Sequence, residues 1–296
     1  MRPYILLTLF LMASALASSA SLAISADSSE YTLGIFGNAN MDEAVDDQDI
    51  DYLKGVIDGS NPATNLSDAN CDGLIDDQDL DQVQKIVDGS ESEIVILDAQ
   101  KRNVTLTVPI KRAVAVNTGA LEIIRAIGVD VSDVFVGVSS YAITNSQYWP
   151  ELKDTTSITY GSPDYEQIAK LDPDVVILYK APKKDEAFDK YQAIGVPVIC
   201  MDCFNQAEMD GSIKIFGEMF NRRTDANGLI EWYHKYVDLI EERANKLSQS
   251  DRPKTLFYNY PESNYPLLKA ANRNSGEQTM IVKAGGVNIA ENLNSS

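Results

Sequence analysis

One sequence pattern occurs twice in the first third of the chain, and the second copy follows the first by 30 residues. Each copy places Asp or Asn at positions 1, 3, 5, 9 and 12 of a twelve-residue loop. A short segment of helical apolar periodicity follows each loop and ends in Asp-Gly, at 58–59 and 88–89. This duplication constrains the fold more than any other feature, because oxygen-bearing side chains at that spacing converge on one point.

The spacing is typical of Ca²⁺ loops, since calcium takes six to eight oxygen ligands and such a loop supplies them from positions 1, 3, 5, 7, 9 and 12. We therefore predict two structural Ca²⁺ sites. The first would use Asn38, Asn40, Asp42, the carbonyl of Ala44, Asp46 and Asp49. The second would use Asp68, Asn70, Asp72, the carbonyl of Leu74, Asp76 and Asp79. We expect stronger binding at 68–79, because Glu43 replaces the turn glycine (Gly73) and Asn38 replaces a carboxylate in the first copy.

The repeated segment is strongly acidic. From Asp27 to Ser92 there are 17 acidic residues and two lysines, which accounts for −15 of the net charge of −19. Without cations the carboxylates would repel one another across a small core, so we expect this segment to fold only with Ca²⁺. The alternative is a solvated acidic linker that binds no metal. The acidity also argues against nucleic acid as a partner.

Residues 34–90 resemble a type I dockerin, which has two loop-plus-helix units without the entering helices of full EF-hands. Gly34-Ile-Phe-Gly37 and Thr64-Asn-Leu-Ser67 leave no room for such helices here. The resemblance implies a small all-α calcium module that docks onto a cohesin-type domain. It also implies that loop positions 10 and 11 face the partner, which are Asp47, Gln48, Asp77 and Gln78. The alternative is a calcium-stabilised spacer that binds no partner.

The N-terminal residues 1–26 have the pattern of a secretory signal peptide. Arg2 precedes an apolar run from Tyr4 to Ala17, and small residues follow. This predicts a secreted or extracytoplasmic protein, associated with the cell surface. The alternative is an uncleaved N-terminal anchor.

Beyond a short polar linker at 91–93, strand-like and helix-like runs alternate, which predicts a parallel α/β lobe over 94–222. A hairpin of 93–97 and 103–108 comes first. A buried strand is expected at 113–116, and further strands are expected at 134–138, 174–179 and 196–200. A helix over 223–250, capped by Thr224-Asp225, would be about 37 Å long and would lead to a second lobe that begins at 251, with a strand at 254–259.

Several stretches in order resemble the substrate-binding proteins of iron-complex and cobalamin ABC importers. They include Val108-Pro-Ile-Lys-Arg112, Leu121-Glu-Ile-Ile-Arg-Ala-Ile-Gly128, Tyr160-Gly-Ser-Pro-Asp164 and Gly285-Gly-Val-Asn288, and the resemblance covers 94–296. It implies a periplasmic-binding-protein fold with a long inter-lobe helix, which captures chelated iron (a siderophore complex or haem) or a corrinoid for an ABC permease. In that family most of a lobe follows the Gly-Gly-Val-Asn stretch, so we expect 251–296 to be a truncated C-terminal lobe.

Ligands of open α/β sheets bind outside the carboxyl ends of the strands. This rule selects polar and aromatic residues, which suit a large planar or amphipathic complex. The candidates are Asn117, Thr118, Tyr141, Tyr160, Ser162, Tyr179 and Tyr258. We find no nucleophile elbow, zinc motif or credible carboxylate pair, so we predict no enzymatic activity and no catalytic residue. The alternative is a dockerin-anchored hydrolase or an adhesive surface protein.

Histidine and cysteine are scarce. His234 is the only histidine, which argues against a free Zn²⁺ or Mn²⁺ cargo, and we expect it on a helix surface. Cys200 and Cys203 are expected to form a small-loop disulfide or to remain as two quiet thiols, with Cys71 unpaired.

Overall fold

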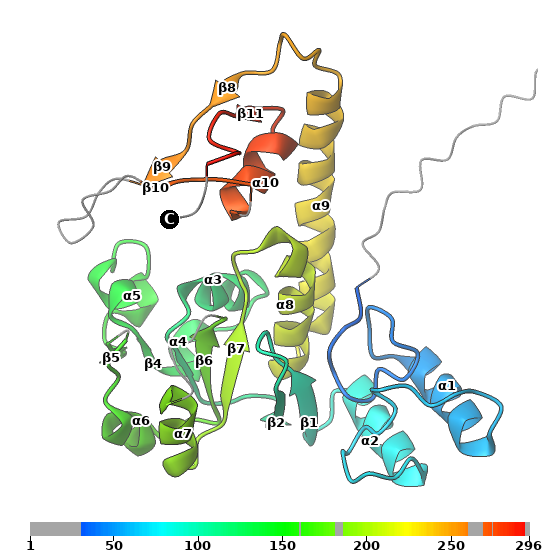
Figure 1. Ribbon diagram of the computed structural model, residues 1–296. Helices are drawn as coiled ribbons and strands as arrows, with labels where there is room; N and C mark the ends of the chain where they lie inside the picture. The colour runs from blue at the N-terminus through cyan, green and yellow to red at the C-terminus, as the bar shows by residue number, and fades with distance from the viewer. Residues whose placement is uncertain (1–30, 160, 181–185, 260–268, 274, 294–296) are drawn as a thin grey trace, which may run out of the picture. The chain divides into compact units, whose positions relative to one another are not determined.

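The computed structural model describes residues 31–159, 161–180, 186–259, 269–273 and 275–293 (Figure 1). The predicted signal peptide at 1–26 and the candidate ligand residue Tyr160 lie outside these residues. Within them, no helix has the length and hydrophobicity that crossing a membrane requires.

Each acidic loop leads into a helix, as the repeat predicted. These are α1 (Asp47–Asp58) and α2 (Asp77–Asp88), whose N-caps Asp46 and Asp76 each form a reciprocal capping box. Both helices end at a glycine in the left-handed conformation, with φ of 82° at Gly59 and 65° at Gly89, which glycine adopts without steric cost. The predicted loop-plus-helix units are therefore present.

The repeat unit, defined here as residues 31–90, does not form a separate module. A single hydrophobic cluster contains Leu53 of α1 and Val83 of α2 together with Ile96, Leu106 and Phe216 from the following part of the chain. Ile35 also forms an isolated antiparallel bridge with Ile96. Because the next strand begins at Ser92, most of the predicted linker at 91–93 belongs to that strand. The hydrophobic core is thus continuous across the boundary that we predicted between the repeat unit and the α/β lobe.

The prediction of a hairpin followed by a parallel α/β lobe is confirmed. Strands β1 (Ser92–Leu97) and β2 (Asn103–Val108) pair antiparallel. Five further strands form a parallel sheet in the order β5-β4-β3-β6-β7. They are β3 (Ala113–Ala115), β4 (Phe135–Ser139), β5 (Thr156–Ile158), β6 (Val175–Tyr179) and β7 (Val198–Met201). The central strands are almost continuously apolar and buried, as in parallel sheets covered on both faces.

Helices connect these strands, and the last of them follows β7. They are α3 (Thr118–Ala126), α4 (Val131–Val134), α5 (Ser140–Thr144), α6 (Tyr165–Leu171), α7 (Glu186–Ala193) and α8 (Gln206–Met219), with a 3₁₀ turn at Pro150–Leu152. The sequence did not predict β5, α4 or α5, which are too short for a periodic signal.

The predicted long helix is α9 (Arg223–Asn245), about 35 Å long and ending before the predicted residue 250. The predicted cap is wrong, because Thr224 and Asp225 lie within the first turn. The N-cap is Arg222, which makes no side-chain capping bond. Contacts of Arg223 with other helices, described below, fix this helix end instead.

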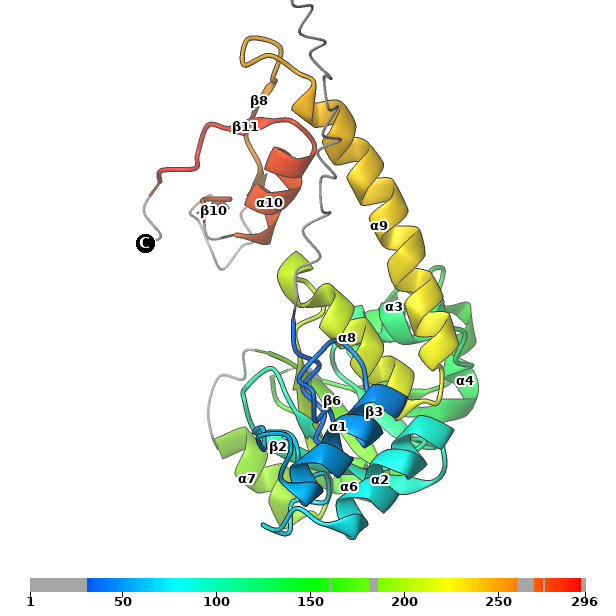
Figure 2. The same ribbon diagram turned by 90° about the vertical axis from the view of Figure 1, so that its right-hand side faces the viewer.

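After α9 come β8 (Lys254–Thr255), β9 (Tyr258–Asn259), β10 (Lys269–Ala270), α10 (Gly276–Lys283) and β11 (Val287–Asn288). The strand expected over 254–259 is therefore divided into β8, which pairs with β11, and β9, which pairs with β10. Figures 1 and 2 both show α10 beside α9, and Lys283 forms an ion pair with Glu241.

Candidate functional site

Asn117 follows β3, and its side chain is buried. Its Oδ1 accepts a hydrogen bond from the Ala120 N–H (3.2 Å), which caps α3. Its Nδ2 donates to the carbonyls of Leu178 (3.3 Å) and Met201 (3.0 Å). Asn117 therefore joins the ends of β6 and β7 to the start of α3, and it supports the sheet edge where we predicted direct ligand contact.

Thr118 and Tyr179 are brought together at this edge. Thr118 Oγ1 lies 3.0 Å from Tyr179 Oη, and the Thr118 N–H donates to the same oxygen at 3.2 Å. The Tyr179 ring stacks on Phe204, with centroids 5.8 Å apart and planes 23° apart. Because Phe204 is 58% exposed, an aromatic surface bordered by hydroxyl groups faces solvent. Such a surface can bind a planar or amphipathic ligand.

Position 119, beside this surface, has room only for a glycine. A Cβ at position 119 would lie 2.8 Å from Cys203 Cβ and 2.9 Å from the Phe204 ring. The first turn of α3 can therefore approach the segment after β7 only because residue 119 has no side chain.

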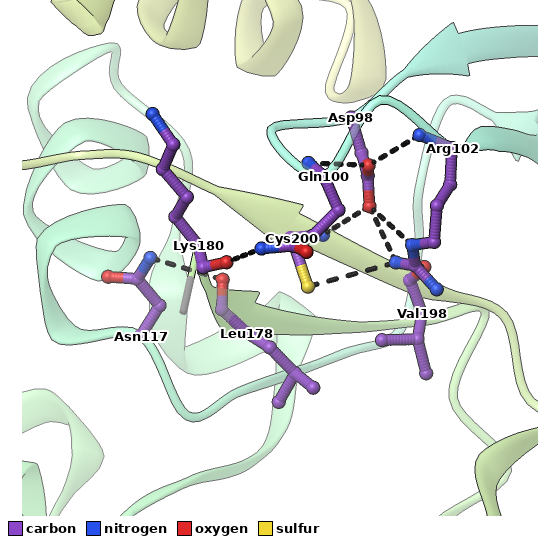
Figure 3. A network of polar contacts seen from close by, with 8 residues as sticks. All are labelled: Asp98, Gln100, Arg102, Asn117, Leu178, Lys180, Val198 and Cys200. Carbon is purple, nitrogen blue, oxygen red and sulfur yellow. Dashed lines mark hydrogen bonds and ion pairs between the residues drawn. The ribbon is translucent and has the colours of Figure 1, made fainter. Parts of the chain in front are cut away.

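Figure 3 shows how the end of β6 is held from both sides. Asn117 binds the carbonyl of Leu178, and the Gln100 side chain binds the carbonyl of Lys180. Tyr179 lies between these two anchored carbonyls. The sequence reasoning missed Gln100, because it assigned this stretch only to the hairpin turn.

The turn between β1 and β2, which contains Gln100, is held in place by Asp98, whose side chain is buried. The Asp98 carboxylate accepts hydrogen bonds from the Gln100 N–H (2.8 Å), the Cys200 N–H (3.2 Å) and Arg102 Nη2 (2.5 Å) (Figure 3). Its charge is thus satisfied by an arginine and by backbone donors, as a buried carboxylate requires. A single Asp in a turn was the only sequence signal for this network.

The edge also carries paired charges. Lys180 Nζ lies 3.0 Å from Asp202 Oδ2 and 3.9 Å from Glu208 Oε1. A cavity of about 330 Å³ adjoins these acids, and its lining includes Tyr31 and Lys101.

The other described candidates come from different elements. Tyr141 is in α5, Ser162 is in the turn before α6, and Tyr258 is in β9 of the C-terminal segment. All three are exposed.

The two acidic loops supply only oxygen ligands, the type that calcium prefers. In the second loop, Asp68 accepts from the N–H groups of Asp72 (3.2 Å) and Gly73 (3.0 Å). The buried Asp79 accepts from Ala69 (2.7 Å) and Asp76 (2.9 Å). These bonds orient the carboxylates, whose oxygens are of the type that a hard cation prefers.

The loop carboxylates bind backbone N–H groups in this structure. No group of three or more His, Cys, Asp or Glu side chains that could hold a metal ion occurs among the described residues. In the first loop, burial raises the pKa of Asp49 to about 6.

His234 lies on α9, where its Nε2 is 2.6 Å from Asp210 Oδ2 of α8. All three cysteines are free: Cys71 is exposed, whereas Cys200 and Cys203 are buried. We expected either a disulfide or two thiols at Cys200 and Cys203, and the structure has two thiols. Burial raises the pKa of each of these two thiols to about 12.

The described residues thus form a parallel α/β sheet that the long helix α9 joins to a further α/β segment. The sequence profile of the family described as periplasmic binding protein matches residues 114–296, and the chain belongs to this family. It is a family of binding proteins rather than enzymes, and its membership indicates an extracytoplasmic location. A comparison with curated proteins gave no match.

Solved structures share the fold at 21–24% identity. The periplasmic solute-binding protein of Veillonella parvula is 24% identical with a TM-score of 0.53, over 69% of this chain and 62% of that chain. The molybdate-binding protein MolA of Haemophilus influenzae, solved with molybdate, is 21% identical with a TM-score of 0.56, over 68% and 67%. The heme-binding protein RhuT of Roseiflexus sp. RS-1, in apo form, is 23% identical with a TM-score of 0.52, over 62% and 68%. The chain thus spans less than two thirds of the first of these structures.

Proposed function

We propose that this protein captures a chelated iron complex (a siderophore complex or haem) or a corrinoid outside the cytoplasm and delivers it to an ABC permease. The observation that carries the proposal is the Thr118–Tyr179–Phe204 surface at the carboxyl ends of the sheet. Its stacked rings and hydroxyl groups suit a ligand with a large flat or amphipathic face. The likeness to a heme-binding protein of the same fold supports this ligand class.

Calorimetric titration tests this proposal. The full chain is titrated with a ferric hydroxamate, a ferric catecholate, hemin and cobalamin in Ca²⁺ buffer. We expect saturable binding of one of them with one ligand per chain. Failure of all four to bind would reject the ligand class.

The alternatives, a surface-anchored hydrolase and an adhesive protein, are less well supported. Membership of a family of binding proteins favours solute capture over hydrolysis. Turnover of a polysaccharide by the purified chain would reverse this preference.

We also propose that calcium binds the repeat unit and stabilises it. The second loop would hold the ion through the oxygens of Asp68, Asn70, Asp72, Leu74, Asp76 and Asp79, and the ion would offset two of the four negative charges there. The hydrogen bonds that orient Asp68 and Asp79 support this role. Titration of the chelator-treated protein with CaCl₂ tests it, and an absence of binding would refute it.

The repeat unit is further proposed to dock onto a cohesin-type partner, as the dockerin resemblance implies. Asp47, Gln48, Asp77 and Gln78 are all exposed at the starts of α1 and α2 and so are free to meet a partner. Size-exclusion chromatography with a panel of cohesin domains, with Ca²⁺ and with EGTA, tests this. A Ca²⁺-dependent complex is expected, and its absence across the panel would refute the proposal.

A further inference from the structure

The two acidic loops differ at two of their defining positions. Position 1 is Asn38 in the first loop and Asp68 in the second, and position 6 is Glu43 in the first and Gly73 in the second. Each difference has a structural consequence that bears on whether the first loop binds a cation.

The Asn38 amide performs a task that a carboxylate cannot. The side chain is buried, and its Nδ2 donates hydrogen bonds to the carbonyls of Leu33 (2.9 Å) and Asp42 (2.7 Å). In the second loop both oxygens of Asp68 accept hydrogen bonds and none is donated. The first loop is therefore closed by its own side chain, and one of the two terminal atoms at position 1 is a nitrogen without ligand capacity.

Position 6 also has a different backbone. Gly73 has a φ of 90°, which an L side chain adopts only with strain. Glu43 is not in the left-handed region. Both loops still bend at positions 5 and 6, so the backbone at position 6 differs between the loops while the turn itself is kept.

Glu43 instead contacts α8. Lys214 Nζ donates to the Glu43 carbonyl at 2.9 Å and lies 3.2 Å from its Oε2. Lys214 is only 17% exposed, so this ammonium group is largely withdrawn from solvent beside the loop. The first loop thus has three carboxylates among its ligand positions and a lysine ammonium group beside it, whereas the second has four carboxylates.

We propose that the first loop is a metal-independent clamp that fixes the repeat unit to α8, with Lys214 supplying the positive charge there, and that calcium binds only in the second loop. The proposal rests on the proposed calcium binding of the repeat unit. It replaces the two sites expected from the duplication by one, because calcium affinity depends on ligand charge and loop rigidity.

The stoichiometry of the full chain tests the proposal. Chelator-treated protein is titrated calorimetrically with CaCl₂, and one ion per chain is expected. Two ions per chain would overturn the single-site inference and leave the proposed calcium function intact. Binding of no ion would overturn both.

A matched pair of variants at loop position 9 locates the site. Asp46→Asn and Asp76→Asn remove the same charge from equivalent N-caps, and asparagine remains a good cap. We expect Asp76→Asn to weaken calcium binding at least about tenfold and Asp46→Asn to change it less than about twofold. Equal weakening by both variants, or a larger effect of Asp46→Asn, would overturn the assignment.

Lys214→Gln tests the clamp, with the exposed Lys170→Gln as control. We expect Lys214→Gln to lower the thermal midpoint by about 3 °C both in Ca²⁺ and in EGTA, and Lys170→Gln to leave it unchanged. No shift for Lys214→Gln, or a shift seen only in Ca²⁺, would contradict a metal-independent clamp.

Discussion

Arg223, the first residue of α9, forms two 2.7 Å hydrogen bonds with the carboxylate of Glu218, near the end of α8. The same guanidinium donates to the carbonyls of Ile86 (2.8 Å) and Val87 (3.1 Å) in the last turn of α2. The C-terminal carbonyls of a helix carry partial negative charge, so a cation is stabilising there. One side chain therefore joins the repeat unit to the start of the inter-lobe helix.

Replacing Arg223 by lysine should lower the free energy of unfolding by about 2 kcal/mol. A lysine ammonium cannot make the paired bonds to Glu218 and reach both carbonyls, and Glu218 is only 9% exposed. Urea unfolding followed by circular dichroism measures the change.

The control for Arg223 is its neighbour Arg222, which is half-exposed and makes only a 3.9 Å ion pair with Asp225. Arg222→Lys should change the free energy of unfolding by less than about 0.5 kcal/mol. Similar values for the two variants would contradict the special role of Arg223.

The sequence predicted the elements whose signals are local. The loop-plus-helix repeats, the hairpin and the parallel strands follow from side-chain spacing and periodicity within short windows. The start of α9 could not be predicted from such local signals. Arg223 is held there by hydrogen bonds to α2 and α8, whereas Thr224-Asp225 has only the sequence pattern of a cap. Tertiary contacts decided that boundary.

The candidate ligand surface could be predicted only in part. The rule for strand ends selected Thr118 and Tyr179, which do meet. The same rule also selected Asn117, whose burial depends on the Met201 carbonyl, 84 residues further along the chain. Gln100 was missed for the same reason, since its partner Lys180 is 80 residues away.

Asn117→Ala should lower the free energy of unfolding by about 2–3 kcal/mol. It removes the cap of α3 and leaves the carbonyls of the half-buried Leu178 and the buried Met201 without this donor. Chemical denaturation measures the loss, and the exposed Asn145→Ala is the control. A loss below about 1 kcal/mol would show that the Asn117 bonds do not hold the strand ends.

Phe204→Ala should weaken binding of the complex identified by titration about tenfold, because it removes one of the two stacked rings that face solvent. Phe204 is largely exposed, so the thermal midpoint should change little. Tyr165→Phe, in α6, is the control and should bind normally. Unchanged affinity in Phe204→Ala would remove the stacked pair from the ligand site.

Thiol labelling should distinguish the cysteines. At pH 7 native protein should react with a maleimide only at the exposed Cys71, and all three thiols should react after unfolding. Cys200 and Cys203 are buried and therefore shielded from the reagent. The pKa is raised at all three cysteines, to about 11 at Cys71 and to about 12 at the other two, so access of the reagent separates them. Raising the pH increases the thiolate fraction about tenfold per unit below the pKa, so any native labelling of these two should accelerate with pH. Rapid labelling of Cys200 or Cys203 at pH 7 would contradict their burial.

Removal of calcium should destabilise the β1–β2 hairpin together with the repeat unit. The second loop holds four carboxylates whose mutual repulsion a bound cation would relieve, and Val83 of α2 shares one hydrophobic cluster with Ile96 and Leu106. Hydrogen exchange in EGTA should therefore show faster exchange in both α2 and β1, while β6 in the parallel sheet serves as the internal reference.

Salt should restore part of the protection because it screens exposed charges. Mg²⁺ should restore less protection than Ca²⁺ at the same concentration, because Mg²⁺ requires a stricter octahedral geometry. Loss of protection in α2 with none in β1 would show that the shared core does not couple the two segments.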